Sequence, residues 1–167
     1  MRARLVALTL AVLMGATMTG CGEPKVSPEE GAEATEAARA EVEDALRSLA
    51  DVASGVGLDL RPLSGRWSVC SAEPPSLEYT AGGSAKPDST TAEAIAALTE
   101  ALEADGWAVE NAGTTPRPYA VLVRDDLRAS LGESRRHPGE VDAGVGSPCV
   151  DTTNEQDDLL GETFEID

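Results

Sequence analysis

Residues 118–133, PYAVLVRDDLRASLGE, constrain the fold more than any other stretch of this 167-residue chain. On both sides of Asp125 and Asp126 the side chains alternate in the way that is typical of strands with one buried face. The two aspartates suit a tight turn, so the segment predicts an antiparallel β-hairpin. The chain is therefore expected to contain an antiparallel sheet.

Two other segments have the spacing of helices. Apolar residues recur at intervals of three and four from about residue 35 to residue 54, and Gly55 follows them. A second apolar face runs through residues 91–104, where Thr90 and Glu93 form a candidate capping box at its start. Both segments are predicted to be amphipathic helices.

Short strands account for most of the remaining apolar segments. They are predicted at residues 65–71, 76–82, 107–113 and about 146–150. Together with the hairpin, the order is helix, two strands, helix, then three or four strands. This order predicts an α+β fold, in which two helices pack on one face of an antiparallel sheet.

Composition divides the chain further. Residues 35–150 form the predicted folded domain, and the polar, acidic residues 21–34, with two prolines, predict a flexible tether. Residues 151–167 hold seven acidic residues and no basic one, which predicts a disordered tail. Part of this tail has acids at the spacing of a calcium loop, but Gln156 stands where such a loop requires glycine. No metal site is predicted.

The charge of the chain excludes some partners. Thirteen Lys and Arg residues face 30 Asp and Glu residues, for a net charge of −17. Such a surface repels nucleic acid and anionic lipid headgroups. Basic surfaces, cations or neutral ligands are the expected partners, and no cofactor is expected.

The first 20 residues have the layout of a secretory signal peptide. Arg2 and Arg4 precede an apolar stretch over about residues 5–16, and small and polar residues then lead to Cys21. This stretch is too short to cross a bilayer, which takes about 20 apolar residues.

Residues 18–21, MTGC, resemble the lipobox of bacterial lipoproteins, in which leucine is commoner at the first position. The resemblance implies cleavage between Gly20 and Cys21 and attachment of diacylglycerol to the Cys21 thiol. Further acylation with a fatty acid such as palmitate follows in many species. Each buried CH₂ contributes about 0.8 kcal/mol, so the acyl chains would hold the protein on the extracytoplasmic face of the cell membrane. An ordinary cleaved signal peptide is the alternative.

Two cysteines remain once Cys21 is lipidated. Cys70 and Cys149 form an even pair in an oxidising setting, so we expect a disulfide between the first strand and the last. It would stabilise the fold by about 4 kcal/mol in the chain-entropy model. Two free thiols or a metal-binding pair are the alternatives, and no neighbouring His or Cys supports a metal site.

Candidate ligand-binding residues are few. Arg135, Arg136 and His137 form the one basic cluster, which could bind an anionic group or lie on a solvated loop. Glu78 and Glu110 lie in predicted strands and could form a carboxylate pair. Four aromatic residues could line a shallow pocket or anchor the packing of the core: Trp67, Tyr79, Trp107 and Tyr119.

No catalytic motif points to a reaction, and a single histidine gives no recognisable Ser–His–acid arrangement. The chain resembles small actinobacterial lipoproteins of unknown function. We therefore expect a non-enzymatic, membrane-anchored domain that binds an envelope protein or a small ligand. The alternatives are an envelope enzyme that acts on cell-wall or lipid material through an unrecognised carboxylate site, and a structural spacer.

Overall fold

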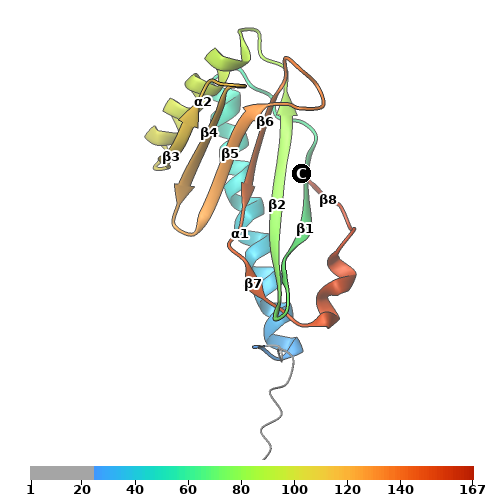
Figure 1. Cartoon of the computed structure of the whole chain (residues 1–167). Coiled ribbons are helices and arrows are strands. Elements are labelled where there is room, and N and C mark those ends of the chain that lie inside the picture. The colour runs from blue at the N-terminus through green and yellow to red at the C-terminus, as the bar shows by residue number, and fades with distance from the viewer. Residues whose placement is uncertain (1–24) are drawn as a thin grey trace, which may run out of the picture.

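The computed structural model describes residues 25–167, and the predicted signal peptide, the predicted cleavage site and Cys21 lie outside them. An antiparallel sheet of eight strands carries two helices on one face (Figure 1). This is the α+β fold that the sequence predicts. The elements are α1 (Pro28–Gly55), β1 (Leu63–Ala72), β2 (Pro75–Ala85), α2 (Thr91–Ala104), β3 (Ala108–Gly113), β4 (Tyr119–Arg124), β5 (Leu127–Glu133), β6 (Val141–Gly146), β7 (Val150–Asp151), the short 3₁₀ helix η1 (Asn154–Leu159) and β8 (Phe164–Ile166).

The strands follow the order β3-β4-β5-β6-β2-β1-β8, and β7 pairs with β2 beyond the end of β6. Two hairpins that the sequence predicts, β1–β2 and β4–β5, are present. Asp125 makes the turn between β4 and β5 with a φ of 52°. Aspartate tolerates this left-handed conformation better than most residues.

The core lies between the sheet and the helices. Leu46 and Leu49 of α1 and Leu98 and Leu102 of α2 are fully buried, as expected from the helical spacing. Alternate residues of the strands complete the core from the sheet side, Leu122 of β4 among them. No helix within residues 25–167 is both long and apolar enough to span a membrane.

α1 begins at Pro28 rather than near residue 35. The Ser27 hydroxyl accepts a hydrogen bond from the Glu30 amide at 3.3 Å, and the Glu30 carboxylate accepts one from the Ser27 amide at 2.8 Å. Proline is compatible with the first turn of a helix because the nitrogen has no helical partner there. The prediction of a tether over residues 21–34 is therefore wrong from Pro28 onward.

Residues 151–167, predicted to be disordered, form β7, η1 and β8. Thr153 and Gln156 make a capping box at the start of η1, and the Gln156 side-chain nitrogen also donates to the Pro28 carbonyl oxygen at 3.3 Å. β8 pairs with β1, and Ile166 is buried. Most acidic side chains of this segment stay exposed, so its high charge does not oppose packing. The prediction of disorder is wrong.

Cys149 lies between β6 and β7 rather than in a last strand. It forms the expected disulfide with Cys70 of β1, across 79 residues of sequence. The bond therefore ties β1 to the β6–β7 connection, whereas the last strand, β8, is held by its own pairing with β1.

Candidate functional site: the helix-free face of the sheet

One face of the sheet carries no helix, and it is turned toward the viewer in Figure 1. An open groove of about 1100 Å³ runs over this face. Residues of β1, β2, β5 and β6 form most of its lining, and residues 134–137, which follow β5, complete it. The groove is the candidate binding site.

The pairing registers arrange the outward side chains of the floor in rows across four strands. From β5 through β6 and β2 to β1, the first row reads Arg128, Gly146, Thr80 and Arg66, and the second reads Ser130, Gly144, Gly82 and Ser64. A third, shorter row reads Gly132, Asp142 and Ser84. The floor is therefore built from small and polar residues, with an arginine at each end of the first row.

Gly82 and Gly144 face each other in the middle of the floor. A Cβ added to Gly82 would lie 2.6 Å from the Ala143 carbonyl oxygen, and one added to Gly144 would lie 2.7 Å from the Ala81 carbonyl oxygen. Such contacts are too close for a packed side chain and would force the strands apart. Only glycine suits both positions, and the floor there is bare main chain.

A hydrogen-bonded loop holds the three basic residues that the sequence singled out. The Ser134 amide donates to the Glu140 carbonyl oxygen at 2.9 Å, and the His137 amide donates to the Ser134 hydroxyl at 3.2 Å. These bonds fix the main chain around Arg135, Arg136 and His137. All three side chains are exposed and line the groove.

In the part of the chain that the structure describes, most basic side chains of the groove have no ion-pair partner, whereas its acidic side chains accept hydrogen bonds from the protein. Within residues 25–167, Arg66, Arg135 and Arg136 form no ion pair, and Arg128 pairs with Glu110 at 2.6 Å on the surface. The three acids of the lining accept hydrogen bonds from the chain itself: Glu78 from Ser68, Asp142 from Ser84 and Glu133 from the Gly139 amide. The groove therefore offers cationic groups on an acidic protein.

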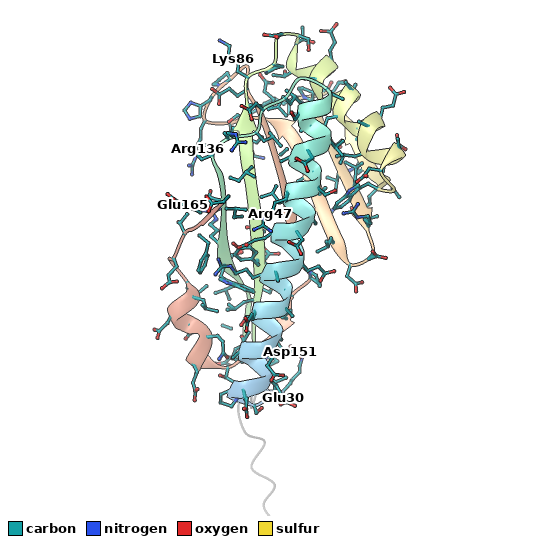
Figure 2. The ribbon with its side chains drawn as sticks, turned by 180° about the vertical axis from the view of Figure 1, so that it is seen from behind. Glu30, Arg47, Lys86, Arg136, Asp151 and Glu165 are labelled. Carbon is teal, nitrogen blue, oxygen red and sulfur yellow. A yellow bond between two sulfur atoms is a disulfide. The ribbon has the colours of Figure 1, made fainter. Side chains whose placement is uncertain are left out.

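The helix-covered face is strongly acidic. α1 carries eight acidic residues and two arginines, and α2 carries three acidic residues and no basic one. Figure 2 shows this face, with α1 lying along the length of the molecule. A face of this charge repels anionic groups.

The aromatic candidates lie outside the groove. Trp67 and Tyr79 are buried, with ring centroids 5.0 Å apart, and Trp107 is buried as well. Tyr119 is half-buried on β4, where its hydroxyl donates to Asn111 Oδ1 at 3.3 Å. The rings of Trp67 and Tyr79 act as packing anchors, and none of the four aromatic candidates lines the groove.

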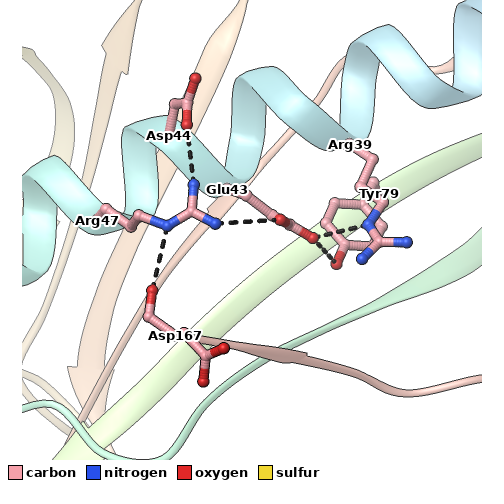
Figure 3. Close-up of polar contacts among 6 residues, drawn as sticks. All are labelled: Arg39, Glu43, Asp44, Arg47, Tyr79 and Asp167. Atoms are coloured by element: carbon pink, nitrogen blue, oxygen red, sulfur yellow. Dashed lines mark hydrogen bonds and ion pairs between the residues drawn. The ribbon is translucent and has the colours of Figure 1, made fainter.

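A polar cluster joins α1 to β2 on the helix-covered side (Figure 3). Glu43 Oε1 accepts hydrogen bonds from Arg39 Nε at 2.7 Å and from the Tyr79 hydroxyl at 3.1 Å. Arg47 pairs with the other Glu43 oxygen at 3.4 Å and donates to the Asp167 carbonyl oxygen at 3.2 Å. These groups bind one another, so the cluster fastens the helix to the sheet.

The surroundings of this cluster shift the pKa values of Glu43 and Tyr79. Burial raises the pKa of Glu43, but the hydrogen bonds from Arg39 and Tyr79 and the charges of Arg39 and Arg47 outweigh it. The pKa of Glu43 therefore lies below its usual value of 4.5. Burial, together with the charge of Glu43, raises the pKa of Tyr79 to about 12. Glu43 is thus held as a carboxylate and Tyr79 as a neutral phenol.

Glu78 and Glu110, which the sequence offered as a possible carboxylate pair, have separate partners. Glu78 accepts a hydrogen bond from the Ser68 hydroxyl at 3.1 Å, whereas Glu110 pairs with Arg128. Glu78 also lies beside the sulfur atoms of Cys70 and Cys149. Those sulfurs are joined in the disulfide and offer no thiolate to a metal ion.

The glycine and serine rows of the floor carry no recognisable motif, so the sequence did not identify them. Strand alternation indicates which of these residues point outward. It does not show that they lie side by side, because that depends on the pairing of β6 with β2. This pairing joins segments about 60 residues apart in the chain and is not readable from local spacing.

Comparison with known proteins gives one family. Residues 34–167 match the family described as "Putative lipoprotein LppJ". Searches of the curated proteins and of the solved structures gave no match. The matched region covers the whole groove and well over half of the sequence, and the chain belongs to this lipoprotein family.

Proposed function

We propose that this lipoprotein is held on the extracytoplasmic face of the cell membrane and binds an anionic envelope ligand in the groove, without catalysing a reaction. The observation that carries the proposal is the gathering of Arg66, Arg128, Arg135 and Arg136 on one face of a chain whose net charge is −17. This revises the expectation of basic surfaces, cations or neutral ligands as partners, because binding depends on the electrostatic potential of the face that the ligand contacts.

The shape of the groove favours binding over catalysis. Its floor is open to solvent along its length, whereas enzymes commonly exclude water from the reacting groups. His137, the one histidine of the chain, is exposed on a loop, and Glu78 is bound to Ser68. An extended ligand can lie on such a surface without being enclosed.

The membrane anchor in this proposal is Cys21. Membership of a lipoprotein family supports an acylated cysteine, and residues 18–21 have the lipobox pattern. Cys21 precedes Lys25 by four residues, which span at most about 14 Å when fully extended. The folded domain would therefore stand close to the bilayer.

Photo-crosslinking in intact cells tests the proposal. A photoreactive residue replaces Ser130, in the second row of the floor, in the full-length tagged chain. The matched control carries the same residue in place of Glu41, which is exposed on α1. A Cys21→Ser form of each chain shows whether the contact requires the anchor.

We expect a recurrent crosslinked product from position 130 that is absent from position 41 and is lost in the Cys21→Ser form. Products of equal yield from both positions, or products only from position 41, would contradict binding in the groove. Conversion of a captured envelope compound by the purified chain would replace the proposal with the enzyme alternative.

A further inference from the structure

We infer that the ligand of the groove is a linear polymer of phosphodiester-linked polyol units, reached from the side away from the membrane. This inference rests on the proposed function and narrows its ligand class. It depends on the spacing of the arginines, on the small residues of the floor and on the position of the basic loop relative to the start of α1.

The spacing of the basic residues suits an extended ligand with repeated charge. Arg128 and Arg66 stand three strands apart in the same row, which places their Cα atoms about 14 Å from each other. The third row lies four residues further along β5, or about 13 Å. Arg135 and Arg136 follow beyond it, so cationic groups occur at both ends of the groove.

The floor between these groups suits a slender chain without rings. Its central positions are Gly146, Gly144 and Gly82, flanked by serine and threonine hydroxyls. Apart from the His137 imidazole, the lining has no aromatic ring on which a sugar or a base could stack. Nucleic-acid sites without sequence preference depend on such stacking. Hydroxyls and bare main chain can instead bond the oxygens of a polyol chain.

Arginine favours phosphate among the anions. Its planar guanidinium can donate two parallel hydrogen bonds to a phosphate group, which adds geometric selectivity to the attraction of charge. Arg66, Arg135 and Arg136 have no carboxylate partner within residues 25–167 and are therefore available for this purpose.

The direction of approach follows from the long axis of the molecule. Figure 2 shows Glu30, in the first turn of α1, near one end and Arg136 toward the other. α1 has 28 residues, which correspond to about 42 Å of helix. A domain anchored just before α1 would hold its basic loop well away from lipid headgroups. The phosphate groups then come from a polymer outside the bilayer.

Calorimetric titration of the full acylated chain in a neutral detergent tests this inference. The probe is a synthetic glycerol-phosphate decamer. Three comparison probes separate the alternatives: polyglutamate of the same charge, a single-stranded oligonucleotide with the same number of phosphates, and glycerophosphoglycerol, which is a lipid headgroup without its acyl chains. The variants are Arg135→Gln/Arg136→Gln and, as a matched control, Arg117→Gln, an exposed arginine outside the groove.

We expect the decamer to bind about tenfold or more tightly than each comparison probe, and the double variant to weaken that binding about tenfold or more. Arg117→Gln should change the affinity less than about twofold. Equal affinity for polyglutamate or the oligonucleotide would overturn the assignment to a polyol phosphate. Equal affinity for the monomeric headgroup would overturn the polymer and its approach from outside the bilayer.

No binding of any probe, together with a specific crosslink from position 130 in cells, would overturn this inference and leave the proposed function intact. No binding together with no crosslink would overturn both.

Discussion

At the scale of single residues, Glu43 shows how a buried charge supports this fold. Its side chain is 13% exposed and is bonded to Arg39, Arg47 and Tyr79. Replacing one member leaves partners without their bonds, which costs about 1–3 kcal/mol. We expect Glu43→Gln to lower the free energy of unfolding at pH 7 by this amount, as measured by urea denaturation.

The effect of Glu43→Gln should depend on pH. The pKa of Glu43 is lowered in the folded protein, so the folded state takes up its proton less readily than the unfolded chain. The stabilisation is therefore complete above pH 4.5 and declines as the pH falls further. The difference between the wild type and Glu43→Gln should shrink accordingly, whereas exposed Glu41→Gln should have little effect at any pH. A difference that grows on acidification would contradict this account.

Two glycines of β6 provide a matched pair for the groove floor. A Cβ on Gly144 would meet the Ala81 carbonyl oxygen at 2.7 Å, but one on Gly146 would meet its first neighbour, Thr80 Cγ2, at 3.4 Å. Gly144→Ala should therefore destabilise the protein by about 1–3 kcal/mol, and Gly146→Ala by less than about 1 kcal/mol. Equal melting temperatures of the two variants would contradict this account and show that β2 and β6 can move apart without loss of stability.

Individual site residues were only partly predictable. The sequence identified Arg135, Arg136 and His137 because a basic cluster stands out in an acidic chain. It also offered Trp67 and Tyr79 as ligand candidates, but large rings gain most from burial and became packing anchors. A basic cluster is recognisable in the sequence of an acidic chain. Whether an aromatic residue is buried or lines a pocket depends on tertiary packing, which one sequence does not reveal.

At the scale of elements, local sequence signals are sufficient to predict a helix or hairpin whose stabilising contacts lie within the element itself. The Thr90 capping box and the β4–β5 hairpin are where the sequence predicts them. The polar, acidic composition around Pro28 predicts a tether, but proline suits the first turn of α1 and the helix begins there. Local signals do not predict the ordered C-terminal segment, because its order comes from contacts with α1 and β1, far away in the sequence.

Phe164 tests whether these distant contacts hold the C-terminal segment. Its ring lies 3.8 Å from the Arg39 guanidinium carbon and 6.0 Å from the Tyr79 ring. Phe164→Ala should lower the free energy of unfolding by about 2 kcal/mol and increase proteolysis within residues 151–167. Glu165→Ala, an exposed change in the same strand, is the control. Unchanged proteolysis of the Phe164→Ala variant would show that other contacts are sufficient to hold residues 151–167 in place.

At the scale of the whole molecule, the fold separates a strongly acidic surface from one on which four arginines gather. The helices carry acidic side chains on one side of the sheet, and the strands present arginines on the other. The sequence predicted the fold class correctly, since the order of helices and strands leaves few arrangements. Net charge alone could not reveal this division, because it averages over both faces.

The proposed membrane anchor belongs to this scale as well. Cys21→Ser removes the thiol that would carry the diacylglycerol, so the variant should leave the membrane fraction for the soluble fraction on cell lysis and fractionation. Cys70→Ser/Cys149→Ser, which leaves Cys21 in place, is the control and should remain with the membranes. An unchanged membrane fraction for Cys21→Ser would contradict acylation at this position.

Carboxylate footprinting of the anchored protein tests most directly that the helix-free face is the binding surface. Carbodiimide coupling in isolated envelopes is compared with coupling of the purified full chain, at Asp142 of the groove floor and at Asp51, which is exposed on α1. We predict that Asp142 is protected in the envelope while Asp51 is labelled equally in both samples. Protection of Asp51 with unchanged labelling of Asp142 would place the partner on the helices and contradict the account.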